Sequence, residues 1–325
     1  MTIQLLMIVS NGEDTILNCL KSYEQAVDRY FICINNSSDK TRYIVKEFKK
    51  SCAVPVVIKF IDFDGFTNTR NKALELSYDL RYTWTLFVDD SYNLSDNFIS
   101  SLSKLDTLNV HCGSVIIRRN TMVYNSNRIV RTASKLKFTG TIHEVINRDS
   151  DFSTKILLED IGTERQLQRT AERVNYDLIC LGDLQDARSM YFRAGCYVQL
   201  YMRGECDISV PIEHYKKRIA CATTDIEETF LSYFHLGHLM TVSKCVKEAV
   251  YNYLKAALLF PNRAGEAYLA VYLLTGNNHF ITKAYEHRTL GPCRLAADKE
   301  LYSDDGIISQ EYAKVFNGNK LDSIL

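Results

Sequence analysis

The chain has 325 residues, of which 46% are hydrophobic and 24% charged, a composition typical of folded globular proteins with room for two domains. Lysine plus arginine and aspartate plus glutamate both total 39, so no net charge attracts nucleic acid, and we expect no nucleic-acid partner. No apolar run reaches the ~20 residues of a membrane span, no secretory signal opens the chain, and the ten cysteines lack CxxC spacing, which predicts a cytoplasmic protein with reduced thiols.

Strand-like and helical patterns alternate through the first quarter of the chain. Short apolar runs, typical of strands buried on both faces, lie at residues 3–9, 29–34, 54–61 and 83–88. Helical spacing separates them at residues 14–26, 40–50 and 70–80. This alternation predicts an α/β fold with a mostly parallel sheet, whose ligand crevice lies beyond the carboxyl ends of the strands. The polar clusters at residues 10–14, 35–39, 62–71 and 89–93 fall at that edge.

Helices alone are predicted from residue 187 onward. Two patterns recur there: Tyr191, Phe192 and Gly195 match Tyr233, Phe234 and Gly237 after 42 residues, and residues 212–215 match residues 250–253 after 38. These offsets are close to the ~34 residues of tetratricopeptide units. We therefore expect an α/β domain at residues 1–178 and an all-α helical-repeat domain at residues 179–325.

Five segments of the first domain carry motifs: MIVSNGED at residues 7–14, INNSSDKT at 34–41, DGFTNTRN at 64–71, WTLFVDDS at 84–91 and GTIHE at 140–144. In order and spacing they resemble MIVKNEED, DTGSTDKT, DFAxARN, WILWLDAD and GxVHE of the family-2 glycosyltransferases. The resemblance is to a branch of that family with a tetratricopeptide-like tail. It implies a GT-A, Rossmann-like domain that transfers a sugar from a nucleotide diphosphate sugar, with inversion, to a protein, peptide or glycan acceptor.

Sugar transfer expels a diphosphate, so Mn²⁺, Mg²⁺ or cationic side chains must stabilise its charge, and a carboxylate must accept the proton of the attacking group. The resemblance implies Glu144 as the general base. It implies a metal site at Asp89, Ser91 and His143. It implies donor contacts from Asn11, Glu13, Asn36, Arg70, Asn71, Asp89 and Asp90. The helical repeats would present the acceptor on a concave surface.

Several of these residues also have plain structural interpretations. Asp39 is a good N-cap for the helix that begins near residue 40, and we favour that role. Arg70 and Asn71 open a predicted helix, whose N–H groups could hold phosphate, or they are ordinary first-turn residues. A row formed by Arg165, Arg169 and Arg173 suggests a solvated basic face more than a diphosphate clamp.

The chain departs from the family pattern at three positions. Ile34 replaces the aspartate that reads the nucleobase, and Gly12 replaces a glutamate. Ser91 replaces the third residue of DxD, and in an extended segment it would share a face with Asp89 while Asp90 points away. These changes leave a second hypothesis open, a degenerate transferase scaffold whose repeats bind a partner protein. A nucleotidyltransferase is less favoured because no Gly-rich phosphate loop follows the first strand. The oligomeric state stays open, a homodimer included.

Overall fold

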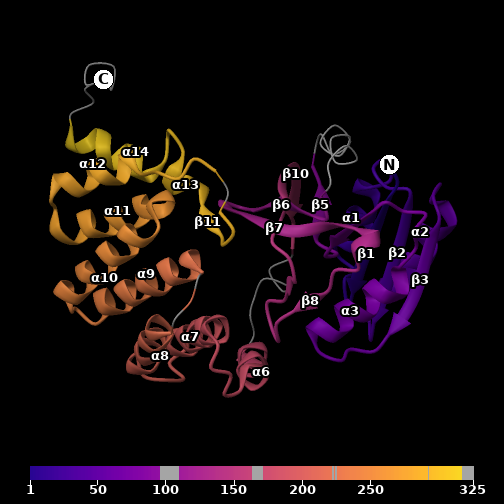
Figure 1. Ribbon diagram of the computed structural model, residues 1–325, viewed down its shortest axis with the longest axis horizontal. Helices are drawn as coiled ribbons and strands as arrows, with labels where there is room; N and C mark the ends of the chain where they lie inside the picture. Colours follow the sequence, from indigo (N-terminus) through magenta and orange to yellow (C-terminus); the bar gives the residue numbers. More distant parts are fainter. Residues whose placement is uncertain (96–109, 163–170, 222, 224, 292, 317–325) are drawn as a thin grey trace. The chain divides into compact units, whose positions relative to one another are not determined.

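The computed structural model describes residues 1–95, 110–162, 171–221, 223, 225–291 and 293–316. Contacts within it form two compact units, Met1–Gln168 and Arg169–Leu325, which are described separately (Figure 1). The predicted boundary between residues 178 and 179 falls inside the helix α6 (Ala171–Leu181). As a domain assignment it stays a prediction.

A mixed, mostly parallel sheet forms the first unit, with the strand order β3-β2-β1-β4-β7-β6-β10-β5. Its parallel part consists of β1 (Ile3–Val9), β2 (Arg29–Asn35), β3 (Val56–Ile61) and β4 (Trp84–Val88). It is extended by β5 (Tyr92–Leu94), β6 (Cys112–Arg119), β7 (Met122–Arg131) and β10 (Phe152–Asp160). β7 runs antiparallel to both β4 and β6. A separate small sheet pairs β8 (Phe138–Thr139) with β9 (Val145–Ile146).

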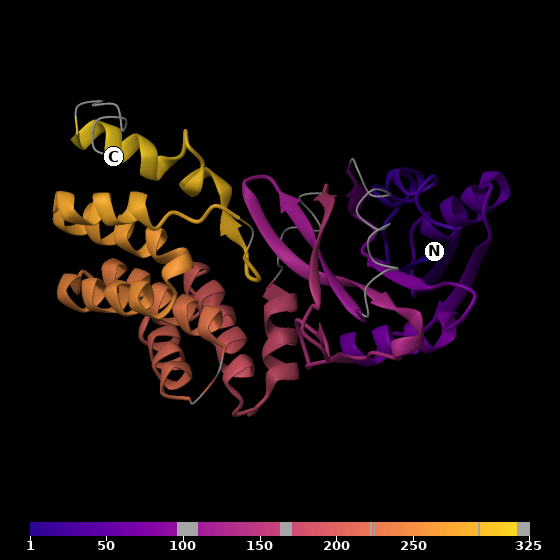
Figure 2. The same cartoon turned by 45° about the horizontal axis from the view of Figure 1, so that its top comes forward.

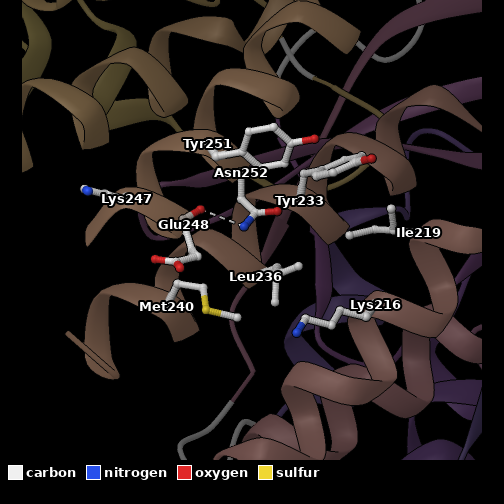
Figure 3. Close-up of a pocket in the computed structure, with 9 residues that line it drawn as sticks. All are labelled: Lys216, Ile219, Tyr233, Leu236, Met240, Lys247, Glu248, Tyr251 and Asn252. Atoms are coloured by element: carbon white, nitrogen blue, oxygen red, sulfur yellow. Dashed lines mark hydrogen bonds between the residues drawn. The ribbon is translucent and has the colours of Figure 1, made fainter. Parts of the chain in front are cut away.

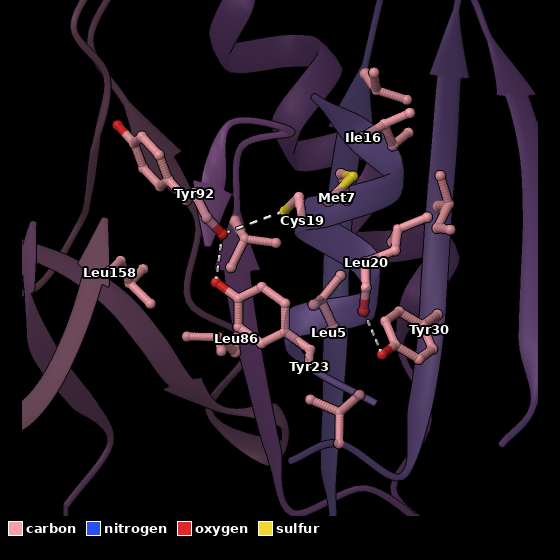
Figure 4. Close-up of a cluster of buried hydrophobic side chains, with 14 of the residues drawn as sticks. Leu5, Met7, Ile16, Cys19, Leu20, Tyr23, Tyr30, Leu86, Tyr92 and Leu158 are labelled. Atoms are coloured by element: carbon pink, nitrogen blue, oxygen red, sulfur yellow. Dashed lines mark hydrogen bonds between the residues drawn. The ribbon is translucent and has the colours of Figure 1, made fainter. Parts of the chain in front are cut away.

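Helices cover both faces of the parallel strands because apolar side chains point to both faces. Leu5 and Met7 of β1 join a core with α1 (Ile16–Ser22) and α2 (Thr41–Ser51), part of which Figure 4 shows. Leu6 faces the other way and packs with Phe87 and with α3 (Phe66–Ser77). A short 3₁₀ helix, η1 (Thr132–Ser134), follows β7.

The second unit is built of successive helices. They are α6, α7 (Ala187–Met202), α8 (Ser209–Ala220), α9 (Ile226–Val242), α10 (Val246–Leu259), η2 (Pro261–Arg263), α11 (Ala264–Thr275), α12 (Asn278–Glu286), α13 (Lys299–Tyr302) and α14 (Ile307–Val315), with a two-residue strand, β11 (Ala297–Asp298). Figure 2 shows α9, α10, α11 and α12 stacked side by side. The recurring sequence patterns lie on α7 and α9, and on α8 and α10. The tetratricopeptide assignment stays a prediction.

The predicted fold class, an α/β sheet followed by an all-helical region, is confirmed. The four predicted strands agree with β1 to β4 to within two residues at each end. Two helices differ: α1 is shorter than expected, and α3 begins at Phe66, four residues before the predicted start at Arg70. Arg165 and Arg169 lie outside the described residues, whereas Arg173 pairs with Asp177 within α6.

The sequence predicted no membrane-spanning segment and reduced cysteines. In the part of the chain that the structure describes, no helix combines the length and the apolar character needed to cross a membrane. All ten cysteines are free thiols, and four of them, Cys19, Cys33, Cys112 and Cys196, are buried.

Candidate functional site

The candidate site lies at the carboxyl edge of the parallel strands, at the switch point of the sheet. β1 pairs with β2 on one side and with β4 on the other. The chain connections therefore leave β1 and β4 in opposite directions, and open α/β sheets bind their ligands in the crevice that this reversal creates. Ser10 and Asn11 follow β1, and Asp89 follows β4. Both strands thus end in polar groups at the crevice.

A pocket of about 190 Å³ opens at this edge, on the face that α3 covers. Asn35, the last residue of β2, lines it; the residue is 8% exposed, and its Oδ1 atom has no hydrogen-bond partner among the described residues. Phe63 and Phe66 also line the pocket, and their rings contact edge to face with centroids 5.1 Å apart. A buried amide oxygen without a partner, beside aromatic rings, suits a planar heterocycle with a hydrogen-bonding edge.

Ile34 is not among the residues that line this pocket. Its side chain is buried on the opposite face of the sheet, in the core with α1 and α2. Neighbouring side chains of a strand point to opposite faces, so Asn35 faces the pocket. No motif marked Asn35. The alternation along β2, with Ile32 and Ile34 both in the core, was the signal that could have placed it.

Asp89 lies at the centre of a cluster of four charged side chains. Its Oδ2 accepts a hydrogen bond from Arg128 Nη2 at 3.0 Å, and its Oδ1 lies 3.6 Å from Arg70 Nη2. Arg70 Nε also pairs with Glu144. Two guanidinium groups and two carboxylates therefore converge, and each oxygen of Asp89 already has a cationic neighbour.

The two arginines keep Asp89 ionised. Burial by itself would raise the pKa of Asp89, but the charges of Arg128 and Arg70 and the hydrogen bond from Arg128 outweigh it and lower the pKa to about 2. Burial would likewise lower the pKa of Arg128, but Asp89 raises it above its ordinary value. Both groups therefore carry full charge at neutral pH.

Arg128, from β7, is a site residue that the sequence analysis missed. Its guanidinium lies over the Tyr92 ring, 5.0 Å from the centroid, and its Nε donates to Ser126 Oγ at 3.1 Å. Its Nη1 is buried without a hydrogen-bond partner among the described residues. No motif marked Arg128. β7 reaches Asp89 only through its antiparallel pairing with β4, which local sequence does not reveal.

Glu144 is placed by contacts between α3 and the loop at residues 138–144. Thr67 Oγ1 donates to the Gly140 carbonyl, and Arg70 pairs with Glu144. The Asn71 amide pairs with both backbone groups of Phe138, at 3.0 and 2.8 Å. Because α3 begins at Phe66, Arg70 and Asn71 lie in its second turn, and the prediction that they open a phosphate-binding helix N-terminus is wrong. Asn71 holds the loop instead.

The Asp89-Asp90-Ser91 segment is a turn rather than an extended strand, since the Tyr92 N–H donates to the Asp89 carbonyl at 3.0 Å. The expected alternation of these side chains is therefore wrong. Asp90 Oδ2 accepts from Thr15 Oγ1 at 2.8 Å, and Ser91 Oγ donates to Asp160 Oδ1 at 2.8 Å. Asp90, predicted to contact the donor, and Ser91, predicted to bind the metal, thus both make contacts within the protein.

Asn11 and Glu13 connect the loop after β1 to the turn after β2. Asn11 Oδ1 accepts from the Ser38 N–H at 2.9 Å, and Glu13 Oε2 accepts from the Lys40 N–H at 3.0 Å. The N-cap of α2 is Lys40, without a side-chain cap hydrogen bond, so the favoured N-cap role of Asp39 is wrong. Asp39 precedes the N-cap and accepts from the Thr41 N–H and the Glu13 N–H, both at 3.0 Å.

Partial burial would raise the pKa of Asp39, but these hydrogen bonds lower it. Asn36 is exposed in a left-handed conformation, with φ 41°. It is not among the residues that line the pocket.

The described residues do not fit the predicted metal site. His143 is exposed on the loop, with φ 50°, and the hydroxyl of Ser91 is bonded to Asp160. In the described ranges, no group of three or more His, Cys, Asp or Glu side chains could hold a metal ion. Mn²⁺ and Mg²⁺ prefer several oxygen ligands, whereas the two carboxylates of the described cluster, Asp89 and Glu144, are already paired with arginines.

A larger pocket, of about 460 Å³, lies in the helical unit between α8, α9 and α10 (Figure 3). Its polar lining includes Lys216, Lys247, Glu248 and Asn252, and its aromatic lining includes Tyr233 and Tyr251. The Asn252 amide donates to the Glu248 carbonyl at 2.7 Å. This surface combines cations with aromatic rings.

No model of a known protein family matches the chain, and no curated protein matches its sequence. Among solved structures, TarS 1–349 from S. aureus is similar at 11% identity over 88% of this chain and 89% of that chain, with a TM-score of 0.38. The same protein in complex with UDP is similar at 12% identity over 85% of this chain and 92% of that chain, with a TM-score of 0.39. HddC from Yersinia pseudotuberculosis is similar at 12% identity over 51% of this chain and 96% of that chain, with a TM-score of 0.33. Because these TM-scores are below 0.5, none of these structures identifies this chain's family or activity.

Proposed function

We propose that the chain is a glycosyltransferase that uses a nucleotide diphosphate sugar. The observation that carries this proposal is the unpartnered amide of Asn35 in a pocket lined by aromatic rings and by Arg70 and Asp89. At about 190 Å³ the pocket is smaller than the ~300–1,000 Å³ of typical small-molecule sites. It suits the base of a nucleotide, with the diphosphate extending toward Arg70 and Arg128.

The chemistry follows from the charges around Asp89. An acceptor hydroxyl or amide attacks the anomeric carbon as the bond from that carbon to the diphosphate oxygen breaks. The electron pair leaves with the nucleoside diphosphate, and the acceptor's proton passes to the Glu144 carboxylate. The guanidinium groups of Arg70 and Arg128 stabilise the additional negative charge. Attack from the side opposite the leaving group inverts the anomeric centre.

The acceptor is proposed to bind the helical unit. Two tyrosines and two lysines line the pocket between α8 and α10. Tyrosine rings provide rigid, amphipathic contact surfaces for peptides and sugars, and lysines favour acceptors that carry acidic groups. We therefore propose a protein, peptide or glycan acceptor with negative charge.

Calorimetric titration with UDP, GDP, ADP and CDP tests the donor site. We expect one of them to bind, and Asn35→Leu to weaken that nucleotide by about ten-fold or more through loss of a buried hydrogen-bonding group. Ile34→Val is the matched control, since Ile34 faces the opposite core and its shortening should leave affinity unchanged. Failure of all four nucleotides to bind would contradict the proposal.

The second candidate is a transferase-like scaffold. It is favoured by the internal hydrogen bonds of Asp90 and Ser91, two residues that the resemblance assigned to the donor and metal sites. A scaffold would bind a partner through the helical unit and would hydrolyse no nucleotide sugar. A donor-hydrolysis assay over several nucleotide sugars separates the two candidates.

A further inference from the structure

We infer that Arg128, together with Arg70, neutralises the donor diphosphate in place of a divalent metal ion, so that the nucleoside diphosphate binds without metal. This inference rests on the proposed function and concerns the same site. It assigns Arg128 to the diphosphate and changes the role of Asp89 from metal ligand to positioning residue.

The pairing of Asp89 is the first support. Arg128 Nη2 lies 3.0 Å from Oδ2, and Arg70 Nη2 lies 3.6 Å from Oδ1. A divalent cation beside this carboxylate would approach two fixed positive charges and would have to displace at least one of them. The repulsion grows as the site is closed to water by a bound donor, because screening then falls.

The second support is that neighbouring side chains hold Arg128 in place. Its side chain is 13% exposed and lies over the Tyr92 ring. Tyr92 is in turn fixed by buried contacts, since its carbonyl accepts from Tyr23 Oη at 2.8 Å and from Cys19 Sγ at 3.2 Å (Figure 4). The guanidinium is therefore held in one place before any ligand arrives.

Arg128 also retains an unused donor. Nε donates to Ser126 and Nη2 to Asp89, while Nη1 has no acceptor among the described residues. A planar guanidinium offers five N–H donors in a fork that matches phosphate oxygens, and buried donors of this kind are rarely left unpaired. A diphosphate oxygen would complete this set.

Among the described residues around Asp89, no second carboxylate is left for a cation. Asp90 bonds to Thr15, and Ser91 bonds to Asp160. The remaining acid of the cluster, Glu144, pairs with Arg70. The acids of this group thus accept from donors of the protein, and the Ser91 hydroxyl donates to Asp160, as expected of a site that uses fixed cations.

Nucleoside diphosphate binding in the presence and absence of metal tests the inference. The full chain is dialysed against EDTA and titrated with UDP, GDP, ADP, CDP and inorganic pyrophosphate, first in metal-free buffer and then with Mn²⁺. We expect the nucleotide that binds to have the same affinity, within about three-fold, in both buffers. Binding that requires Mn²⁺ would overturn the inference and leave the proposed function intact. No binding in either buffer would overturn the proposed function as well.

Two variants locate the effect at Arg128. Arg128→Met should weaken nucleotide and pyrophosphate binding in metal-free buffer by at least about ten-fold. Arg81→Met is the matched control: it removes the same charge from an exposed arginine that precedes β4 at the amino edge of the sheet, and should change nothing. Unchanged binding by Arg128→Met, with native circular dichroism, would overturn the assignment.

Asp89→Asn provides a readout that does not depend on the stability of the arginine variant. The amide keeps the shape of the carboxylate and can still accept from Arg128, so metal-free affinity should fall by less than about ten-fold. If the wild-type chain bound the nucleotide only with Mn²⁺, and the variant bound it neither with nor without Mn²⁺, Asp89 would be a metal ligand. That result would contradict the inference.

Discussion

Gly12 lies directly against the carboxylate of Asp90. A Cβ atom at this position would be 2.4 Å from Asp90 Oδ2 and 2.8 Å from Val9 Cγ2. Neither neighbour can move freely, because Asp90 is bonded to Thr15 and Val9 is buried in the core. The packing of the turn after β4 therefore leaves no room for a side chain at position 12. From the sequence alone, Gly12 was interpreted as the replacement of a glutamate.

Gly12→Ala should destabilise the first unit by about 1–3 kcal/mol, as overpacking does in other cores. Urea denaturation followed by tryptophan fluorescence measures this, since the one tryptophan, Trp84, is buried in that unit. Gly12→Ala combined with Asp90→Ser should recover the part of the loss that comes from the contact with Asp90, whereas the contact with Val9 Cγ2 remains. A wild-type midpoint for the single variant would contradict the packing argument.

Glu144→Gln tests the proposed base. The glutamine keeps the shape of the side chain beside Arg70 but cannot take up a proton, so donor hydrolysis should fall by about 100-fold to 10,000-fold. Nucleoside diphosphate affinity should be retained, because the diphosphate contacts are assigned to the arginines. Wild-type turnover in this variant would remove Glu144 from the role of base.

At the level of single residues, the sequence predicted only part of the site. Arg70, Asp89 and Glu144 belong to recognisable motifs, and the structure brings them together. Asn35 was missed because motif comparison followed position 34, whereas side-chain direction depends on the strand's register. Arg128 was missed because its approach to Asp89 depends on pairing between distant strands.

The recurring sequence pattern of the helical unit contains a matched pair of glycines. Gly237 in α9 packs against Tyr253, where a Cβ atom would lie 2.7 Å from the ring, whereas Gly195 in α7 has nothing within 4 Å. Tyr253 is 2% exposed and hydrogen-bonds His238 Nδ1 at 3.0 Å, so its ring cannot easily move. The two glycines of the recurring pattern therefore have different surroundings: Gly237 makes room for Tyr253, whereas Gly195 faces open space.

Gly237→Ala should destabilise the helical unit by about 1–3 kcal/mol, whereas Gly195→Ala should stabilise it by about 0.5–1 kcal/mol through helix propensity. Thermal unfolding followed by circular dichroism at 222 nm compares the two variants. Equal effects of the two substitutions would show that the contact with Tyr253 does not govern the choice of glycine.

We expect His235, in α9, to make the stability of the helical unit depend on pH. Burial, followed by the charges of His238 and Arg263, lowers the pKa of His235 to about 4. The folded chain keeps the ring neutral while the unfolded chain takes up a proton near pH 6.5. Stability is therefore present above that pH and is lost as the pH falls from about 6.5 to about 4.

The loss between pH 7 and pH 5 should be no more than about 2 kcal/mol for this group. His235→Phe keeps a ring beside Tyr215, whose centroid lies 5.6 Å away. Urea midpoints at the two pH values should therefore differ less for the variant than for the wild-type chain. The same pH dependence in both proteins would rule out His235 as its source.

At the level of elements, periodicity predicted the strands well because all four parallel strands are apolar on both faces. The start of α3 was predicted too late. Its first turn, with Thr67, Asn68 and Thr69, is polar and has the composition of a loop, yet Thr67 and Thr69 bond to Gly140 and Asp64. The contact of Thr67 with Gly140, 73 residues away, cannot be derived from local spacing.

For the whole molecule, the order of the strands matters more than any single motif. The switch between β1 and β4 creates the crevice, and the sequence predicted its location because polar clusters follow each strand. The antiparallel strand β7, which carries Arg128, completes the charged cluster from a distant part of the chain. We therefore expect a nucleotide to bind in the crevice of the sheet.

Crystal structures of the chain with the nucleoside diphosphate that binds, grown in metal-free buffer, test the central claim most directly. We predict the base in the pocket beside Asn35, Phe63 and Phe66, and the diphosphate within hydrogen-bonding distance of Arg128. A nucleotide bound elsewhere on the chain, or a diphosphate directed away from Arg70 and Arg128, would contradict the claim that this crevice is a glycosyltransferase donor site.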